Sequence, residues 1–116
     1  MRFLMIVKSD EATEAGAMPE EEVMASIGKY NDEMEKAGVM LSGEGLHPSS
    51  KGARIDYAGS ERTVTDGPFA NAKELIAGYW VIEVASKDEA VEWAKRCPFE
   101  DGQIELRQIF GAEDFA

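Results

Sequence analysis

The stretch RTVTDGPFANAKEL, residues 62–75, holds the side chains best suited to chemistry. Asp66 ends a strand-like run directly before Gly67-Pro68-Phe69, and Lys73 and Glu74 follow within one short loop. A positioned carboxylate acts as a hydrogen-bond acceptor or as a general base. A lysine close to it supplies a positive charge for an anionic or enol substrate. The spacing therefore predicts a catalytic role for Asp66 and a substrate-binding role for Lys73.

The same residues also make sense as a purely structural turn. Pro68 fixes its own φ angle and lacks a backbone N–H, and it biases Gly67 away from helical conformation. Asp66 is suited to accept backbone N–H groups in an Asx turn, and Phe69 to anchor the loop by packing. Both interpretations stay open from the residues alone.

His47, the chain's single histidine, is the second candidate for proton transfer. An imidazole titrates near neutral pH, which suits a general base. His47 is equally interpretable as a surface residue at a strand end, held in place by Pro48. Glu44 lies three residues earlier on the same predicted strand. We predict that His47 and Glu44 join Asp66 as catalytic residues.

The elements that must position these residues follow from hydrophobic periodicity and from turn and capping signals. Pro19 is expected to open a helix with an acidic first turn, and Ser86 with Glu89 fits a capping box for a second helix. Residues 9–18 are expected to form a polar loop. We expect helices over 19–37 and 86–97, strands over 3–7, 39–48, 77–85 and 103–110, and a hairpin over 54–58 and 62–65.

Without the hairpin, the predicted order is β-α-β-β-α-β, the ferredoxin-like pattern of an α+β fold. A chain of 116 residues fits one domain, so residues 1–116 are expected to form a single unit. The two helices cover one face of the sheet and leave the other face bare. Something is expected to cover that face, and we predict a homodimer.

Strand alternation predicts which side chains occupy the bare face. Val39 and Leu41 are expected under the helices. The non-helical face is expected to carry Glu44, Tyr79, Glu83, Glu105 and Arg107. Once covered, such a face would enclose a small polar cavity, so Tyr79, Glu83 and Arg107 are predicted to bind substrate. The alternative is an open, solvated face on which Arg107 pairs with a glutamate.

The composition excludes several classes of function. The formal net charge is −11 and no basic cluster exists, which argues against nucleic acids and anionic membranes as partners. No apolar run approaches the ~20 residues that span a bilayer, and the N-terminal segment lacks the features of a signal peptide. A single cysteine, Cys97, excludes an internal disulfide and suggests the cytoplasm.

No metal or cofactor is expected. One cysteine and one histidine cannot supply a structural zinc site. The sequence contains no G-x-G-x-x-G, Walker or H-E-x-x-H motif. Cys97 falls on the apolar stripe of its predicted helix and is expected to pack in the core.

Four segments carry a resemblance to a known family: GEGLHP at 43–48, VTDGPFANAKELIAGYWVIEV at 64–84, EAVEWAKRCP at 89–98 and GQIELRQI at 102–109. In this order and nearly end to end, they resemble the YCII-related family in its DGPF-domain branch. The resemblance implies a ferredoxin-like subunit that dimerises into an α/β barrel with facing sheets. It is also similar to proteins encoded beside sigma factors of the extracytoplasmic-function type.

Two classes of function follow as expectations. The first is a small cofactor-independent enzyme that performs proton transfer or elimination on a small polar or aromatic molecule. The resemblance supports it, because the wider family is thought to include enzymes with a His–Asp pair in a cleft. The second is a non-catalytic module that senses a ligand or contacts a protein, linked to sigma-factor regulation. Several acids on an inward face favour the enzyme.

Overall fold

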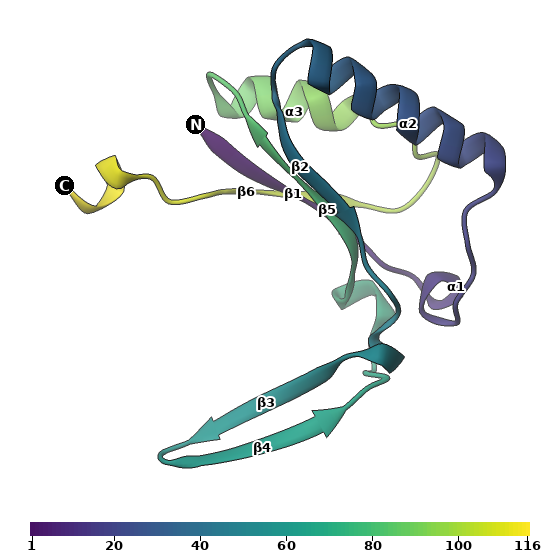
Figure 1. The fold of residues 1–116 in the computed structure, drawn as a ribbon, viewed down its shortest axis with the longest axis vertical. Helices are drawn as coiled ribbons and strands as arrows, with labels where there is room; N and C mark the ends of the chain where they lie inside the picture. Colours follow the sequence, from purple (N-terminus) through teal and green to yellow (C-terminus); the bar gives the residue numbers. More distant parts are fainter.

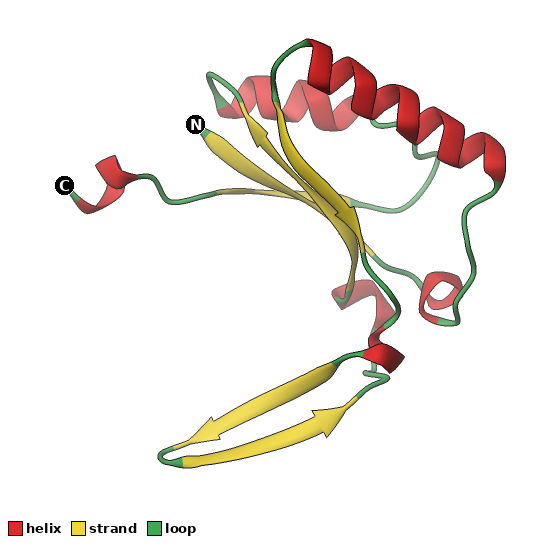
Figure 2. Ribbon diagram, viewed as in Figure 1, coloured by secondary structure: helices red, strands yellow, loops and turns green.

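The computed structural model describes all residues from Met1 to Ala116 and has the predicted α+β ferredoxin-like fold (Figures 1 and 2). Its main sheet has four antiparallel strands in the order β2-β5-β1-β6. The strands are β1 (Arg2–Lys8), β2 (Met40–Gly45), β5 (Ile76–Glu83) and β6 (Ile104–Gln108). Helices α2 (Glu21–Lys36) and α3 (Lys87–Lys95) cover one face of this sheet.

The remaining elements lie outside this framework. A separate two-stranded sheet is formed by β3 (Ala53–Ala58) and β4 (Glu61–Asp66), as the predicted hairpin. A short helix, α1 (Glu11–Glu14), lies where a loop was expected. Single 3-10 turns are η1 (Ser49–Lys51), η2 (Ala72–Glu74) and η3 (Ala112–Phe115).

Capping explains where the helices begin. Ser86 Oγ accepts a 3.1 Å hydrogen bond from Glu89 N, so the predicted start of α3 is confirmed. The prediction that Pro19 opens α2 is wrong by two residues, because Glu20 is the N-cap and keeps an extended backbone. Asp10 caps α1 by accepting from Thr13 N at 2.7 Å, and this hydrogen bond lowers the pKa of Asp10.

The hydrophobic core lies between the helices and the sheet. It consists of Phe3, Met5, Tyr30, Met34, Val39, Trp80, Ile82, Val84, Ala90 and Trp93. Tyr30 ties the two helices together, because its hydroxyl donates to the backbone oxygen of Trp93 at 2.6 Å. Burial raises the pKa of Tyr30 well above its ordinary value. Cys97 packs against this core, as predicted.

Strand β2 departs from the prediction in two ways. A bulge between Met40 and Ser42 makes Leu41 the extra residue, and Leu41 is 52% exposed rather than covered by the helices. Met40 takes the core-facing place instead. The strand also ends at Gly45, so His47 lies in the following loop. After the bulge, Glu44 pairs with Tyr79, and both belong to the non-helical face as predicted.

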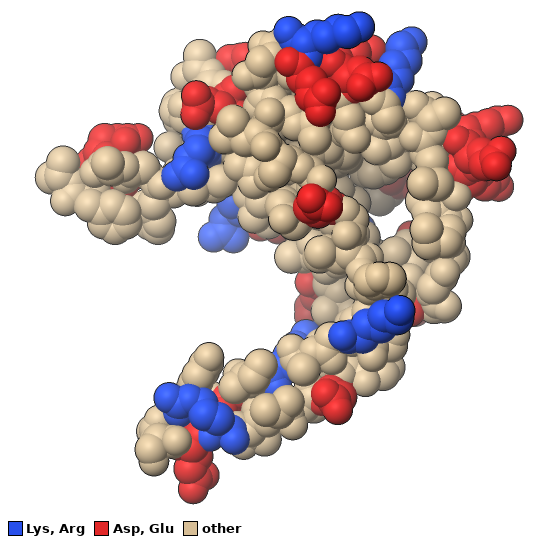
Figure 3. Space-filling model, viewed as in Figure 1, with Lys and Arg blue, Asp and Glu red and all other residues tan.

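The single chain is too open for a compact protein of its size. Its Cα radius of gyration is 16.3 Å, against about 13 Å for a compact chain of this length. It exposes 8321 Å², about 2,100 Å² more than the roughly 6,200 Å² typical of its mass. The excess comes from the hairpin and the C-terminal segment, which project on the side of the sheet opposite the helices and leave a hollow between them (Figure 3).

Candidate active site

A cavity of about 870 Å³ lies at the β2–β5 edge of the sheet, beneath the N-terminal half of α2. The loop from α1 to α2 forms its outer wall, and its opening is visible between this loop and the sheet (Figure 3). Apolar groups from Met24, Ile27, Trp80 and Phe99 line it. A volume of this size falls in the range of small-molecule sites.

Three of the predicted site residues border this cavity: Glu44 at the end of β2, His47 in the loop after it, and Tyr79 on β5. The cavity lies beneath α2, whereas the side chains of Glu44 and Tyr79 are directed to the opposite, non-helical face of the sheet. Glu44 and Tyr79 lie side by side on that face because they are cross-strand partners. His47 follows Glu44 by three residues, beyond the end of the strand. The cavity is therefore built around the GEGLHP segment.

The other four predicted residues lie elsewhere. Asp66 ends β4 opposite Ala53, and Lys73 lies exposed in η2. Neither lines the cavity. Of the three predicted catalytic residues, His47 and Glu44 border the cavity and Asp66 does not.

Glu83 and Arg107 lie on the non-helical face, as predicted from alternation. Glu83 is exposed and is the cross-strand partner of Arg2. The guanidinium of Arg107 lies 3.3 Å from the carboxylate of Glu105, which is the open, solvent-exposed pair considered as an alternative. Such exposed pairs contribute little to stability.

Asn31 is a cavity residue that sequence reasoning missed. Its Oδ1 accepts a 2.8 Å hydrogen bond from Trp80 Nε1. Because an indole N–H only donates, this bond fixes the amide so that Nδ2 keeps its two donors. Asn31 lines the cavity, and no protein group accepts from Nδ2. On the helix surface, Asn31 carries no sequence signal that separates it from other polar residues.

The Asp66-Gly67-Pro68-Phe69 loop is held against η1, which starts two residues after His47. Gly67 N donates to Gly52 O at 3.0 Å, and Phe69 N donates to Ser49 Oγ at 3.0 Å. The Gly67–Pro68 peptide bond is cis. A Cβ atom added at Gly67 would lie 1.8 Å from the backbone oxygen of Ser49. Gly67 is therefore required by close approach, since its φ is not positive.

Glu14 completes this attachment and was also missed from the sequence. Its carboxylate accepts both the backbone N–H of Ser49, at 3.0 Å, and the Ser49 hydroxyl. Ser49 in turn accepts from Phe69 N. Helix α1, the loop after His47 and the DGPF loop thus form one hydrogen-bonded unit behind the cavity. Residues 9–18 were expected to form a polar loop, so this role of Glu14 was missed. A single helical turn leaves no periodic pattern in the sequence.

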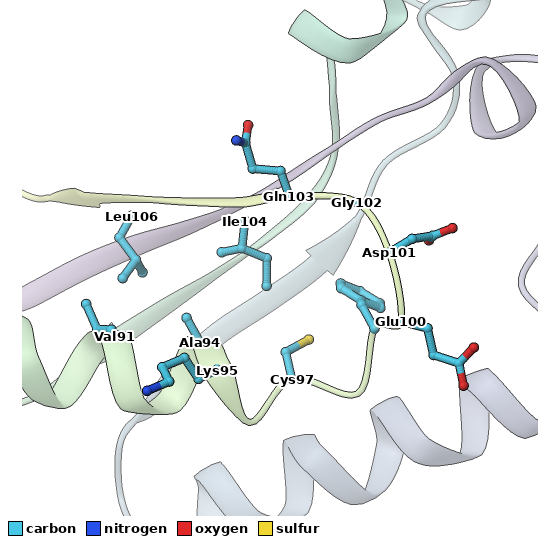
Figure 4. A pocket seen from close by; sticks show the side chains of 11 residues that line it. Val91, Ala94, Lys95, Cys97, Glu100, Asp101, Gly102, Gln103, Ile104 and Leu106 are labelled. Carbon is cyan, nitrogen blue, oxygen red and sulfur yellow. The ribbon is translucent and has the colours of Figure 1, made fainter.

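A second, shallower groove of about 470 Å³ lies between α3 and β6 (Figure 4). Ile104 and Leu106 point toward α3, whereas Glu100 and Asp101 point away from the groove. Burial raises the pKa of the Cys97 thiol to about 11, so the thiol stays protonated and unreactive at neutral pH. This groove is the exposed rim of the core.

Sets of three or more His, Cys, Asp or Glu side chains with metal-binding geometry are absent from the chain. None of the helices has the length and apolarity needed to cross a bilayer.

The YCII-related domain model matches residues 1–113. The chain belongs to the YCII-related family. One relative is the uncharacterized protein R00369 of Rhizobium meliloti (strain 1021). The two sequences are 32% identical over 97 residues, which cover 82% of this chain and 78% of that protein. The family prediction made from the four sequence segments is confirmed.

A solved structure shares the fold of this YCII-related chain. It is the 5-chloro-2-hydroxyhydroquinone dehydrochlorinase TftG from Burkholderia phenoliruptrix AC1100, in complex with 2,5-dihydroxybenzoquinone. The similarity has a TM-score of 0.51 at 12% sequence identity and covers 98% of each chain. At this identity the similarity establishes the fold alone.

Proposed function

We propose that this YCII-related protein is a cofactor-independent enzyme that performs acid–base chemistry on a small hydroxylated aromatic molecule. The observation that carries the proposal is the cavity at the β2–β5 edge, whose lining includes His47 and the oriented amide donor of Asn31. The homodimer expected from the bare sheet face is part of the proposal.

The lining of the cavity supports this ligand class. Trp80 and Phe99 offer aromatic contacts. The charged lining groups are the acids Asp10, Glu44 and Asp101 against the single cation Lys8. This excess of acids disfavours a polyanion, and it favours a neutral aromatic ring that carries hydroxyl or carbonyl groups.

Each polar group has a defined part in the proposed reaction. His47 accepts the proton of a ligand hydroxyl or of an acidic C–H bond, and the electron pair of that bond moves onto a ligand oxygen. Asn31 Nδ2 donates to this oxygen as its charge develops. The catalytic role of Glu44, whose side chain belongs to the non-helical face, stays a prediction. The bond that breaks afterwards, in an elimination, depends on the leaving group of the substrate.

Proton transfer is placed on His47 rather than on Asp66, because His47 lines the cavity and Asp66 does not. The catalytic role of Asp66 and the substrate-binding roles of Lys73, Glu83 and Arg107 stay predictions. The DGPF loop has a positioning role in this proposal, since it holds η1 and thereby the end of the His47 loop.

The homodimer is supported by the exposed surface of the single chain, which is about 2,100 Å² larger than is typical of its mass. Leu4, Ile6 and Val81 make the non-helical face apolar at its centre, and in the single chain they are only half-buried. Burial of about 2,100 Å² by each of two copies would make an interface in the size range of obligate dimers. Light scattering at micromolar concentration tests this, and a clean monomer of 12.7 kDa would remove the dimeric barrel.

A ligand screen by thermal shift tests the function. The panel contains small carboxylates, phenols, enols and hydroxylated benzoquinones, the last because TftG binds one. A ligand at 100 times its dissociation constant adds roughly 2.7 kcal/mol of stability. Phenols or hydroxyquinones are expected to raise the melting temperature, and carboxylates are not. A flat response across the panel contradicts the proposal.

Variants at Asn31 and His47 separate binding from chemistry. Asn31→Asp keeps the acceptor for Trp80 but removes the amide donors, so ligand affinity is expected to fall about tenfold or more. The neighbour Asp32 is exposed, does not line the cavity, and supplies the control variant Asp32→Asn. His47→Gln should preserve binding and lower turnover by about 10²-fold or more. Binding without any turnover in the wild type would favour the sensing module instead.

A further inference from the structure

We infer that the β3–β4 hairpin is an arm whose apolar face docks on a second copy of the chain. The hairpin pairs with no other strand and projects from the body on the side opposite the helices (Figure 1). Every one of its residues is exposed in the single chain. The inference rests on the homodimer proposed above and adds the element that each subunit extends onto the other.

The two faces of the hairpin differ in chemistry. Cross-strand pairing and alternation place Ala53, Ile55, Tyr57, Arg62, Val64 and Asp66 on one face. The centre of this face is the directly opposed pair Ile55 and Val64, with Tyr57 beside it. The opposite face carries Arg54, Asp56, Ala58, Glu61, Thr63 and Thr65. The hairpin is therefore amphipathic, with a polar face suited to solvent and an apolar face suited to packing against another surface.

The apolar face is bare in the single chain. Ile55 is 47% exposed, Val64 is 63% exposed and Tyr57 is 74% exposed. A two-stranded hairpin is at best marginally stable in water unless it packs against another surface. Since no part of its own chain covers this face, the covering surface must come from another molecule.

Shape and charge favour a second copy as that molecule. The arm and the C-terminal segment border the hollow on the non-helical side, where the partner sheet of the proposed dimer would sit (Figure 3). The arm carries two arginines against three acids, whereas the chain as a whole has a net charge of −11. A nearly neutral arm can therefore approach an acidic subunit with little repulsion. In a two-fold symmetric dimer, each arm docks on the other subunit, so neither arm stays exposed.

The pairing register of β3 with β4 also determines on which face of the arm Asp66 lies. It shares the docking face with Ile55 and Val64, at the base of the arm. Its carboxylate therefore faces the second subunit rather than the cavity of its own chain. This gives the separation of Asp66 from His47 a physical reason within one dimer.

Sedimentation velocity over a concentration series tests the arm, with Val64→Glu as the disruptive variant. The change enters the interface twice, and each charge in an apolar contact costs about tenfold in affinity or more, so the dissociation constant is expected to rise about a hundredfold. Thr63→Glu is the matched control, because Thr63 is the next residue on the same strand and lies on the polar face. It should change the dissociation constant less than about threefold.

Val64→Thr is a milder variant that tests the same contact while the hairpin stays folded. Thr keeps the β-branched shape and strand preference of Val but adds a hydroxyl to the apolar face, so a clear weakening is expected with the hairpin intact. An unchanged dimer in Val64→Glu overturns the arm and leaves the dimer standing. Equal weakening by Thr63→Glu overturns the choice of face. A monomeric wild type overturns both arm and dimer, while the ligand screen still tests the cavity separately.

Discussion

Replacing Gly67 with alanine should displace the DGPF loop from its position against η1. The added Cβ would lie 1.8 Å from the backbone oxygen of Ser49, and contacts under 3.0 Å do not occur, so the loop must move by at least about 1.2 Å. Such a shift breaks or weakens the 3.0 Å hydrogen bonds from Gly67 N and Phe69 N. Overpacking costs about 1–3 kcal/mol and the loss of one of these two hydrogen bonds about 1 kcal/mol, which together predict a loss of about 2–4 kcal/mol.

Thermal unfolding followed by circular dichroism measures this loss. At about 4 °C per kcal/mol for a domain of this size, the melting temperature should fall by roughly 8–16 °C. Gly45→Ala is the control, because an added Cβ there meets nothing within 4 Å, and it should change the melting temperature by less than about 2 °C. If Gly67→Ala melts within about 2 °C of the wild type, the loop is not seated on Ser49 and the reasoning fails.

Three further predictions concern stability. Tyr30→Phe leaves the buried backbone oxygen of Trp93 without its 2.6 Å donor, and chemical denaturation should report a loss of about 1–2 kcal/mol. The raised pKa of Cys97 stabilises the folded state fully below pH 9 and no longer once the pH passes about 11. Between these values, the melting temperature of the wild type should fall more steeply than that of Cys97→Ala. Glu14→Gln loses the charge-assisted bonds to Ser49 and should lower stability by about 1–2 kcal/mol, whereas an unchanged denaturation midpoint would contradict the Glu14 attachment.

The sequence predicted the framework well because periodicity and capping act locally. The β-α-β-β-α-β order, the start of α3 at Ser86 and the isolated hairpin all followed from patterns within a few residues. The bulge that exposes Leu41 was not predictable, because it arises from the pairing of β2 with β5. One extra residue changes the alternation between the two sides of the bulge, so Met40 rather than Leu41 faces the core, while Glu44 keeps its predicted face.

The site was predicted in part for the same reason. Glu44, His47 and Tyr79 border one cavity because strand pairing joins segments whose residue types already suggested chemistry. Asn31 stayed hidden, since its importance comes from a hydrogen bond to Trp80, 49 positions along the chain. Asp66 was expected to act with His47 because the Gly67-Pro68 turn fixes its direction and Lys73 follows closely, yet the register of β4 directs it elsewhere.

The imidazole of His47 gives the most direct test of the proposed function. His47 is the only histidine, so its ring Cε1–H signal in a proton–carbon NMR spectrum is unique and needs no assignment. We predict that a phenol or hydroxyquinone from the screen shifts this signal in proportion to saturation of the cavity, and that Asn31→Asp requires a higher ligand concentration for the same shift. A His47 signal that stays unmoved while the melting temperature reports full ligand binding would contradict the account.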